Sequence, residues 1–492
     1  MPYQLPADCL DEIFDYLEEE KFSLHSCLLV NRFWCVISVR ILWKNVLGSN
    51  QFNLPPKILD TLISCLPNVS KELLHKNEIF TSTLTSKPPL FNYASFCKVL
   101  SIRRIDQMIQ HALENQQSKQ SIISRSLNYC KYLLFQEILK MFMKQIPSLK
   151  ELRYNSTENI INVTFTYFPG AIDCLTNLTV LNCSSDIYPE LFYQLSQICY
   201  NIQSLTIEFE STVSNGLKDL ISSQHNLKHL SLIQTYDGAN WTDIIPSLIK
   251  HSKTLVKLKI NGGENSGPLS FITDFINLEE LVLSFHYRDS FCELNKLQYI
   301  KFPKLQILKF PYGCPRFDIL IKFLEISGRN LKEFYIGDYD NSLNLAIAKF
   351  CPNLKSLFTI FMDNELETLK LIFNQCQLLE SVRIWCGYEL LREKDFLETL
   401  AKYSPKNFRK LRLFNDSDSK LVSKDLEEFF VNWKNRVPQK SLHFTIIKYF
   451  EEDDSLEKND ENMKIIEKYE KLGIIKEFET IKFEDEEQLH FI

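Results

Sequence analysis

Large aromatic side chains and arginines recur at similar intervals late in this 492-residue chain, and these residue types suit binding rather than catalysis. Aromatic residues and arginine are enriched among the residues that carry most of the energy of protein interfaces. The four aromatic positions are separated by 23, 27 and 29 residues, and an arginine stands two positions before each of the last two. We predict that they anchor a protein substrate. The candidate substrate-binding residues are Tyr335, Phe358, Arg383, Trp385, Arg412 and Phe414.

These intervals belong to a longer repeat. A leading apolar residue, often preceded by Asn, recurs every 23 to 29 residues, and a second apolar residue follows three positions later. This period is typical of leucine-rich repeats, in which each unit supplies a short parallel strand and a returning helix. Because neither element can bury its apolar face alone, we predict an α/β fold, a leucine-rich-repeat solenoid (horseshoe). The leading residues are Leu149, Leu178, Ile202, Leu227, Leu255, Leu278, Leu305, Leu331, Leu354, Leu379 and Phe408.

The register of the repeat decides which strand residues are available for binding. Side chains alternate between the two faces of a strand. If the leading residue and the residues three and five positions later are buried, the residues two, four and six positions later lie on the concave face. The six candidate residues all occupy such positions. Two alternatives stay open: the C-terminal tail covers these side chains, or the register slips by one position and buries them.

Catalysis and metal binding find little support in the sequence. The nine histidines are scattered, and no G-x-S-x-G, H-E-x-x-H, P-loop or dinucleotide-binding motif occurs. The 14 cysteines include no C-x-x-C pair, and Cys174, Cys199, Cys351 and Cys376 each stand three or four positions before a leading residue. That placement favours packing in the core over metal binding. We expect no catalytic residue, no metal and no cofactor.

An N-terminal head, residues 1–47, precedes the repeats and has the periodicity of helices. Pro6 stands at the entry to a first amphipathic helix, whose first turn is acidic. Apolar residues at helical spacing predict two further short helices, the last ending near Trp43. A head of this size has only a small core, so it is marginally stable alone and leans on a neighbour or a partner.

The apolar residues of the head follow the order of a known motif. They read Leu5-Pro6, Asp8, Leu10, Ile13-Phe14, Leu17, Leu24, Val30, Trp34 and Leu42-Trp43. This order resembles an F-box, by which substrate receptors dock on the Skp-family adaptor of cullin-RING ubiquitin ligases. An F-box directly before leucine-rich repeats is a familiar pairing, so the chain resembles the F-box/leucine-rich-repeat substrate receptors.

The resemblance implies an adaptor-binding surface on the head. Leu5, Pro6, Leu10, Ile13 and Leu17 would face the adaptor, whereas Val30, Trp34 and Trp43 would divide between the small core and the interface. The sequence departs from the motif at two places. Cys9 precedes Leu10 where the family usually has an acid followed by an aliphatic residue, and Val30-Asn31-Arg32-Phe33-Trp34 replaces the common Val-Cys-Lys-x-Trp. Neither change removes an apolar anchor. Alternatively, these residues only pack the head on the repeats.

The remaining boundaries follow from composition. Residues 48–95 read as a partly helical connector, and residues 96–450 as the repeats, the first units of which are degenerate. Residues 451–492 form an acidic tail or cap: 15 acids and 6 lysines give a net charge of −9, against −6 for the whole chain. The rest of the chain therefore sums to only +3, which gives nucleic-acid binding little electrostatic support.

The ends of the chain and its apolar runs bear on location. The sequence has no basic start followed by an apolar run and no apolar stretch of about 18 residues, so we expect no membrane association and a cytoplasmic or nuclear protein with reduced thiols. The resemblance implies a non-catalytic subunit of an SCF-type E3 ubiquitin ligase, whose F-box binds the Skp-family adaptor and whose concave face holds a protein substrate for ubiquitin-dependent degradation. The alternatives are a leucine-rich-repeat scaffold without a ligase role and an unrecognised hydrolase.

Overall fold

The computed structural model describes residues 6–18, 20–48, 56–79, 89–117, 127–155, 163–235, 238–263, 266–415, 419–448 and 456–483. The chain divides into two compact units, Met1–Leu227 with Pro246–Leu248, and Lys228–Ile245 with Ile249–Ile492. In each unit short parallel strands alternate with helices along the chain. The predicted α/β class is therefore confirmed.

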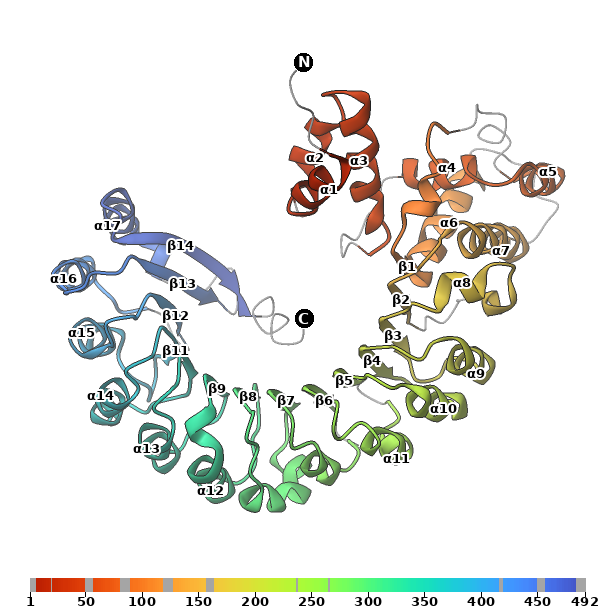
Figure 1. Ribbon diagram of the computed structural model, residues 1–492. Helices are drawn as coiled ribbons and strands as arrows, with labels where there is room; N and C mark the ends of the chain where they lie inside the picture. The colour runs from red at the N-terminus through yellow and green to blue at the C-terminus, as the bar shows by residue number, and fades with distance from the viewer. Residues whose placement is uncertain are drawn as a thin grey trace. The chain divides into compact units, whose positions relative to one another are not determined.

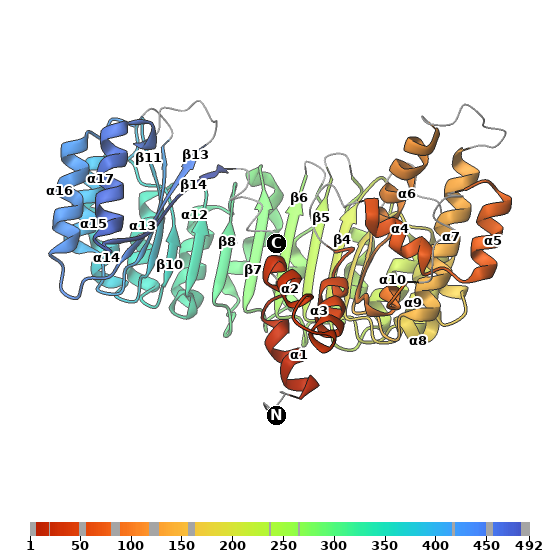
Figure 2. The same cartoon turned by 90° about the horizontal axis from the view of Figure 1, so that it is seen from above.

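Three short helices form the head at the start of the first unit: α1 (Ala7–Asp15), α2 (Lys21–Cys27) and α3 (Arg32–Lys44). Figure 2 shows them packed together as a small bundle. Asn31, one of the two departures from the expected motif, begins α3, because its side-chain oxygen accepts a hydrogen bond of 2.9 Å from the backbone N–H of Trp34. The core of the bundle consists of Leu10, Phe14, Leu24, Ile37 and Ile41.

Strand and helix units follow the head in the first unit. The connector holds α4 (Pro56–Ser64), α5 (Asn68–Lys76) and a 3₁₀ helix, η1 (Tyr93–Phe96). Four strands then pair in chain order, each parallel to the one before it. The elements are β1 (Val99–Ser101), α6 (Ile102–Gln117), α7 (Leu127–Gln145), β2 (Glu151–Tyr154), η2 (Phe165–Tyr167), α8 (Ala171–Leu175), β3 (Val180–Ser184), α9 (Pro189–Ile198), β4 (Ser204–Phe209) and α10 (Asn215–Ser223).

The second unit continues the same pattern with parallel strands in chain order. Its helices α12 to α17 lie on one side of strands β8 to β14 (Figures 1 and 2), which leaves the opposite side of these strands, the open face, without helices. The elements are β5 (His229–Gln234), η3 (Thr242–Ile244), α11 (Ile245–Ile249), β6 (Lys257–Gly262), η4 (Ser270–Asp274), β7 (Glu280–Phe285), η5 (Arg288–Tyr299), β8 (Ile307–Phe310), α12 (Phe317–Ser327), η6 (Gly328–Asn330), β9 (Glu333–Ile336), α13 (Asn341–Phe350), β10 (Ser356–Phe358), α14 (Leu366–Gln375), β11 (Ser381–Cys386), α15 (Glu393–Tyr403), β12 (Lys410–Asn415), α16 (Ser423–Lys434), β13 (Leu442–Lys448), η7 (Leu456–Lys458), α17 (Asp460–Lys471) and β14 (Ile475–Lys482).

The strands pair in the register that the repeat predicts. Leu308 of β8 lies opposite Phe334, which lies opposite Leu357, and that residue lies opposite Val382. The eleven leading residues are all fully buried or nearly so. The apolar pattern therefore identified the buried side of each strand correctly.

The repeats extend beyond the predicted boundary at residue 450. After β13, the helix α17 and the strand β14 form one more unit, and β14 pairs with β13 in parallel. Residues 451–455 and 484–492 of the predicted acidic tail lie outside the described residues. Within the described part, residues 456–483 form an ordered unit that caps the strands, which is one of the two forms, tail or cap, that the composition left open.

Side chains at two recurring positions tie each unit to the one before it. Asn residues directly before leading positions donate from Nδ2 to a backbone oxygen one unit earlier: Asn277 to Lys253 O (3.2 Å) and Asn353 to Arg329 O (2.8 Å). At the recurring cysteine position, the Cys376 thiol lies 3.3 Å from Cys351 O. The Asn contacts lie at the surface, whereas the Cys376 thiol satisfies a carbonyl that is buried between two units.

The buried thiols predict a loss of stability at alkaline pH. Burial raises the pKa of Cys199 and Cys376 from 9.0 to about 12, so above pH 9 the unfolded chain loses protons that the folded chain keeps. Stability is fully present below pH 9 and then falls by about 1.4 kcal/mol per pH unit for each such thiol. Urea unfolding between pH 7.5 and 10.5 should show a shallower fall for Cys376→Ala, whereas the exposed-cysteine control Cys292→Ala should follow the wild type. Equal slopes in all three proteins would contradict this prediction.

Candidate functional site

The head presents apolar side chains to solvent beside its closed core. Of the residues predicted to bind the adaptor, Pro6, Ile13 and Val30 are exposed, with exposed fractions of 47% for Ile13 and 56% for Val30. Leu5 lies outside the described residues. Among the described residues of the head, the other exposed large apolar side chains are Tyr16, Phe22, Leu29 and Val36.

Leu10 was expected to face the adaptor, but its side chain is only 2% exposed and belongs to the core of the head. Leu10, Phe14 and Leu17 are spaced four and three residues apart, so they follow one stripe of α1, and this stripe packs inward. Leu17 and Trp34 are half-buried against that core, and the Trp34 ring meets Phe14 edge to face at 5.1 Å between centroids. The amphipathic stripe thus forms the core, and the exposed apolar residues lie beside it.

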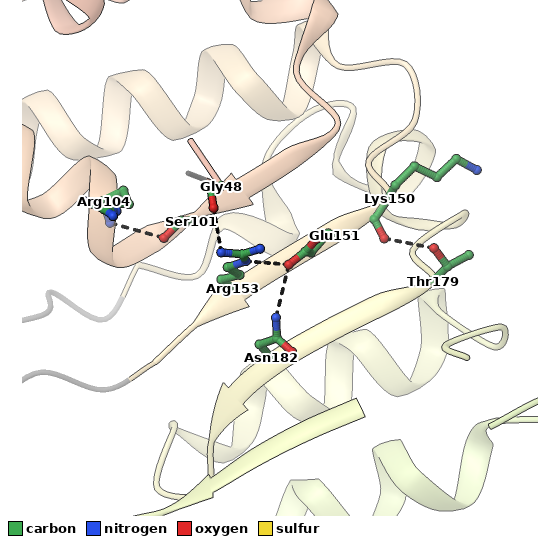
Figure 3. Close-up of polar contacts among 8 residues, drawn as sticks. All are labelled: Gly48, Ser101, Arg104, Lys150, Glu151, Arg153, Thr179 and Asn182. Carbon is green, nitrogen blue, oxygen red and sulfur yellow. Dashed lines mark hydrogen bonds and ion pairs between the residues drawn. The ribbon is translucent and has the colours of Figure 1, made fainter. Parts of the chain in front are cut away.

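Polar contacts join the end of the head to the first repeat strands (Figure 3). The backbone N–H of Lys98 donates to Lys44 O at 2.8 Å, and the Arg153 guanidinium of β2 donates to Gly48 O at 2.8 Å. Glu151 holds Arg153 in place, with 2.5 Å between its Oε1 and Arg153 Nε, and it also accepts a bond of 3.2 Å from Asn182 of β3. Glu151, Arg153 and Asn182 stand two or four positions after a leading residue, and on β2 and β3 these positions hold the segment that directly follows the head.

The six residues predicted to bind a substrate come together in the structure, but they are not displayed on an exposed surface. Tyr335, Phe358, Arg383 and Phe414 are buried, and Trp385 and Arg412 are half-buried. The register is not at fault, because their neighbours Leu357 and Val382 are buried on the opposite side. The expectation of exposure was wrong for a different reason, which is that the side chains cover one another and are covered by the C-terminal unit.

The aromatic rings pack in sequence across neighbouring strands. Ring centroids are 4.3 Å apart for Tyr335 and Phe358, 5.8 Å for Phe358 and Trp385, and 4.9 Å for Trp385 and Phe414. Phe483, at the end of β14, lies 5.6 Å from Phe414 and 6.2 Å from Trp385. Strands lie less than 5 Å apart, so large side chains at equivalent positions must touch. They form a second apolar cluster on the open face.

Arg383 lies inside this aromatic cluster with an exposed fraction of 4%. Its guanidinium carbon is 4.7 Å from the centroid of the Phe358 ring, 5.2 Å from Tyr335 and 5.5 Å from Phe483. It also donates a hydrogen bond to the Tyr335 hydroxyl. Three aromatic faces and a hydroxyl therefore fix the position of a buried cation.

A pocket of about 520 Å³ adjoins the aromatic cluster on the open face of β8 to β12. Ser356 of β10 lies opposite Ser381 of β11. Glu333 of β9 lies beside Ser356, and Lys410 of β12 lies beside Ser381. Because the serine side chains are small, they leave a hollow between the larger groups. The next row on the same side, two positions further along each strand, adds four residues to the lining of the pocket: Tyr335, Phe358, Arg383 and Arg412.

The lining of the pocket is strongly positive. It includes six basic and two acidic side chains, a formal sum of 6 − 2 = +4. Glu333 lies 3.3 Å from Lys309, and Glu380 lies 3.6 Å from Lys355 and 2.5 Å from Arg409. The basic residues are Lys309, Lys355, Arg383, Arg409, Lys410 and Arg412.

Basic residues also line the open face of β5 and β6. Burial lowers the pKa of Lys259, and the neighbouring cations Lys309 and Lys257 lower it further, against the opposing effect of Glu280. Burial and the nearby Lys257 likewise lower the pKa of His229, against the opposing effect of Glu280. Glu280 lies 3.0 Å from Lys257 and 3.8 Å from Lys259, so it balances part of the positive charge of these strands.

The comparisons with known proteins add no family. No protein-family model matches the chain, and a search of curated proteins returns no similar sequence. Within the ranges that the structure describes, no helix has both the length and the apolar character needed to cross a membrane. The same residues contain no group of three or more His, Cys, Asp or Glu side chains placed to hold a metal ion.

Proposed function

We propose that this chain is the substrate-recognition subunit of an SCF-type E3 ubiquitin ligase. The head would act as an F-box that binds the Skp-family adaptor, and the open face of the leucine-rich repeats would hold the protein substrate. The chain itself would then be non-catalytic, and its cytoplasmic or nuclear location would follow from that of the ligase.

One observation carries the proposal. The head closes a core of its own and still exposes Ile13, Val30 and four other large apolar side chains within about 40 residues. Six large apolar side chains left exposed on so small a body favour a partner that covers them. The order of the residues in the head resembles the F-box, which names the partner.

Binding to the adaptor tests the proposal. The residues substituted in this test are exposed, so their replacement leaves the core of the head intact. For the full chain and a purified Skp-family adaptor, we expect Ile13→Asp with Val30→Asp to weaken binding at least about thirtyfold, equivalent to about 2 kcal/mol. The matched control is Val69→Asp with Ile172→Asp, which changes an exposed valine and an exposed isoleucine outside the head. The control should bind like the wild type in calorimetry or surface plasmon resonance.

Two results would refute the adaptor role. One is the absence of binding by a folded wild-type chain, and the other is an equal loss in the head variant and the control. Recovery of the adaptor without cullin in a pull-down would favour the scaffold alternative, in which the head binds an adaptor outside any ligase.

A further inference from the structure

Exposed tyrosines gather at one edge of the strands of the second unit. Three of the four tyrosines that are exposed in the described part of this unit follow β7, β9 and β11: Tyr287, Tyr339 and Tyr388, with exposed fractions of 56%, 54% and 76%. After β8, the Tyr312 ring stacks on His286 with 4.2 Å between centroids. Because β7 to β11 are parallel and pair in chain order, their carboxyl ends lie at one edge. We call the loops at this edge, residues 286–290, 311–316, 337–340, 359–365 and 387–392, the tyrosine rim.

We propose that the tyrosine rim docks an extended protein segment that carries an arginine at every third position. Tyrosine presents a large flat surface at little conformational cost and suits protein interfaces, where one side of the ring is covered and the hydroxyl stays in water. A guanidinium stacks on the face of such a ring. The proposal goes beyond the adaptor role of the head and does not depend on it.

The charges of the rim select a basic partner. The rim arginines Arg288 and Arg316 are each paired with an aspartate. One of the carboxylates that remain stands two residues after Tyr287 and another directly after Tyr388, so a guanidinium on either ring has a carboxylate beside it in the sequence. Together with the exposed Arg392, the three carboxylates sum to 1 − 3 = −2. These carboxylates are exposed, and no salt bridge engages them within the part of the chain that the structure describes: Asp289, Asp363 and Glu389.

Contacts between the loops fix the rim before a partner binds. The Arg288 guanidinium, after β7, donates to Asp338 Oδ2, after β9, at 3.0 Å from Nε and 2.6 Å from Nη2. Its carbon lies 4.6 Å from the centroid of the Phe317 ring, which follows β8. The loops after β10 and β11 are joined by the backbone N–H of Asp363, which donates to Glu389 O at 3.0 Å. A surface that is fixed in advance loses little conformational entropy on binding.

The spacing of the tyrosines sets the spacing of the arginines. Tyr287, Tyr339 and Tyr388 follow every second strand. Neighbouring strands lie about 4.8 Å apart, so successive tyrosines are about 10 Å apart along the rim. An extended chain advances about 3.3 Å per residue, so three residues of the partner span the same distance. Arginines separated by two residues can therefore each stack on one ring.

Fluorescence anisotropy with the full-length chain tests the proposal. The probe is a fluorescein-labelled nonapeptide of glycine and serine with arginine at the second, fifth and eighth positions. One comparison peptide has citrulline, which is neutral and has nearly the same shape, in place of each arginine, and another has the three arginines adjacent. We expect the spaced arginine peptide to bind at least tenfold more tightly than the citrulline peptide and at least threefold more tightly than the clustered peptide. Its affinity should fall as salt rises from about 0.05 to 0.5 M. Equal binding of the spaced peptide and either comparison peptide would overturn the proposal.

Substitution of the tyrosines locates the site. Tyr339→Ala with Tyr388→Ala should weaken binding of the spaced peptide at least about fivefold, because two guanidinium groups lose the rings on which they stack. Both side chains are exposed, so the fold should not change. The control is Tyr129→Ala with Tyr299→Ala, which removes two exposed tyrosines outside the rim and should leave binding unchanged. An unchanged affinity in the rim variant, or an equal loss in the control, would overturn the assignment.

Substitution of the carboxylates tests the charge of the rim. Asp363→Asn with Glu389→Gln should weaken binding of the spaced peptide at least about threefold, with a smaller dependence on salt than in the wild type. The control is Glu293→Gln with Glu325→Gln, which neutralises two exposed carboxylates of the same unit outside the rim. If the control lost as much affinity as the rim variant, the peptide would be bound by the overall negative charge of the chain, and the assignment would be wrong.

Three further measurements separate other occupants and the role of the head. Spermine carries positive charges without a guanidinium or a peptide, and its displacement of the probe at a concentration tenfold below that of the unlabelled spaced peptide would overturn the assignment to an arginine segment. A wild-type dimer in sedimentation velocity that becomes a monomer in the Tyr339→Ala, Tyr388→Ala variant would assign the rim to a second copy of this chain instead. The head variant Ile13→Asp with Val30→Asp should bind the spaced peptide like the wild type, so failure of the adaptor role leaves this result intact.

Discussion

Leu10→Ala is expected to destabilise the head by about 2–5 kcal/mol, which is large for a bundle of three short helices. Leu10 is almost completely buried and contacts the core that Phe14, Leu24, Ile37 and Ile41 form. Removing its side chain leaves a cavity in a core too small to rearrange around it. Hydrogen exchange monitored by mass spectrometry should show faster exchange in peptides from α1, α2 and α3, with little change in peptides from the second unit.

Ile13→Ala is the matched control on the same helix. Its side chain is about half-exposed, so its truncation should change protection of the head by less than about 1 kcal/mol. For adaptor binding, Leu10→Ala acts by unfolding the head, whereas Ile13→Ala acts on a folded head. Equal protection of the wild type and Leu10→Ala would mean that Leu10 is not a core residue.

The sequence predicted the repeats because their information is local. Each leading residue and the one three positions later report the buried side of a strand, and neighbouring units repeat the same spacing. Paired residues such as Leu357 and Val382 can therefore be aligned without a structure. The role of the Asn before the leading residue was not predicted, although its recurrence was visible, because its acceptor is a backbone oxygen in the previous unit.

The environment of the open face could not be predicted in the same way. The covering of Trp385 and Phe414 depends on Phe483, which is about 70 to 100 residues later in the chain. The sequence left open whether the C-terminal tail covers these side chains but could not decide it. The sequence left a tail or a cap open after residue 450, and the burial of Ile466, Tyr469 and Ile475 shows that they hold one more unit in place. A tertiary contact of this kind leaves no periodic trace in the sequence.

The pocket has a signal in the sequence. Aligning the strands places Ser356 and Ser381 next to each other, with a charged residue on either side. Two small residues side by side among large ones predict a hollow. The positions two residues later on the same strands hold Arg383 and Arg412, which line that hollow. Attention to the aromatic residues alone identified Arg383 and Arg412 but assigned them to an exposed binding surface.

Phe358→Ala is expected to destabilise β9, β10 and β11 by about 3–5 kcal/mol, the usual cost of removing a buried phenylalanine. The Phe358 ring is 2% exposed, and it touches the rings of Tyr335 and Trp385 as well as the Arg383 guanidinium. Without the Phe358 ring, the Arg383 guanidinium would pack on one aromatic ring fewer and would lie over a cavity. Hydrogen exchange of these strands measures the loss locally, which suits a repeat protein whose units unfold in part.

Phe358→Leu fills most of the same space and should restore most of the stability, which separates packing from the aromatic face. If the Phe358 ring also stabilises the Arg383 guanidinium, Phe358→Leu should still leave the strands slightly less protected than in the wild type, because the guanidinium loses a cation–π contact. An exposed binding residue would behave in the opposite way, with binding lost in Phe358→Ala and protection unchanged. The aromatic cluster would then be a substrate surface after all, and its burial by Phe483 would have to open when the substrate binds.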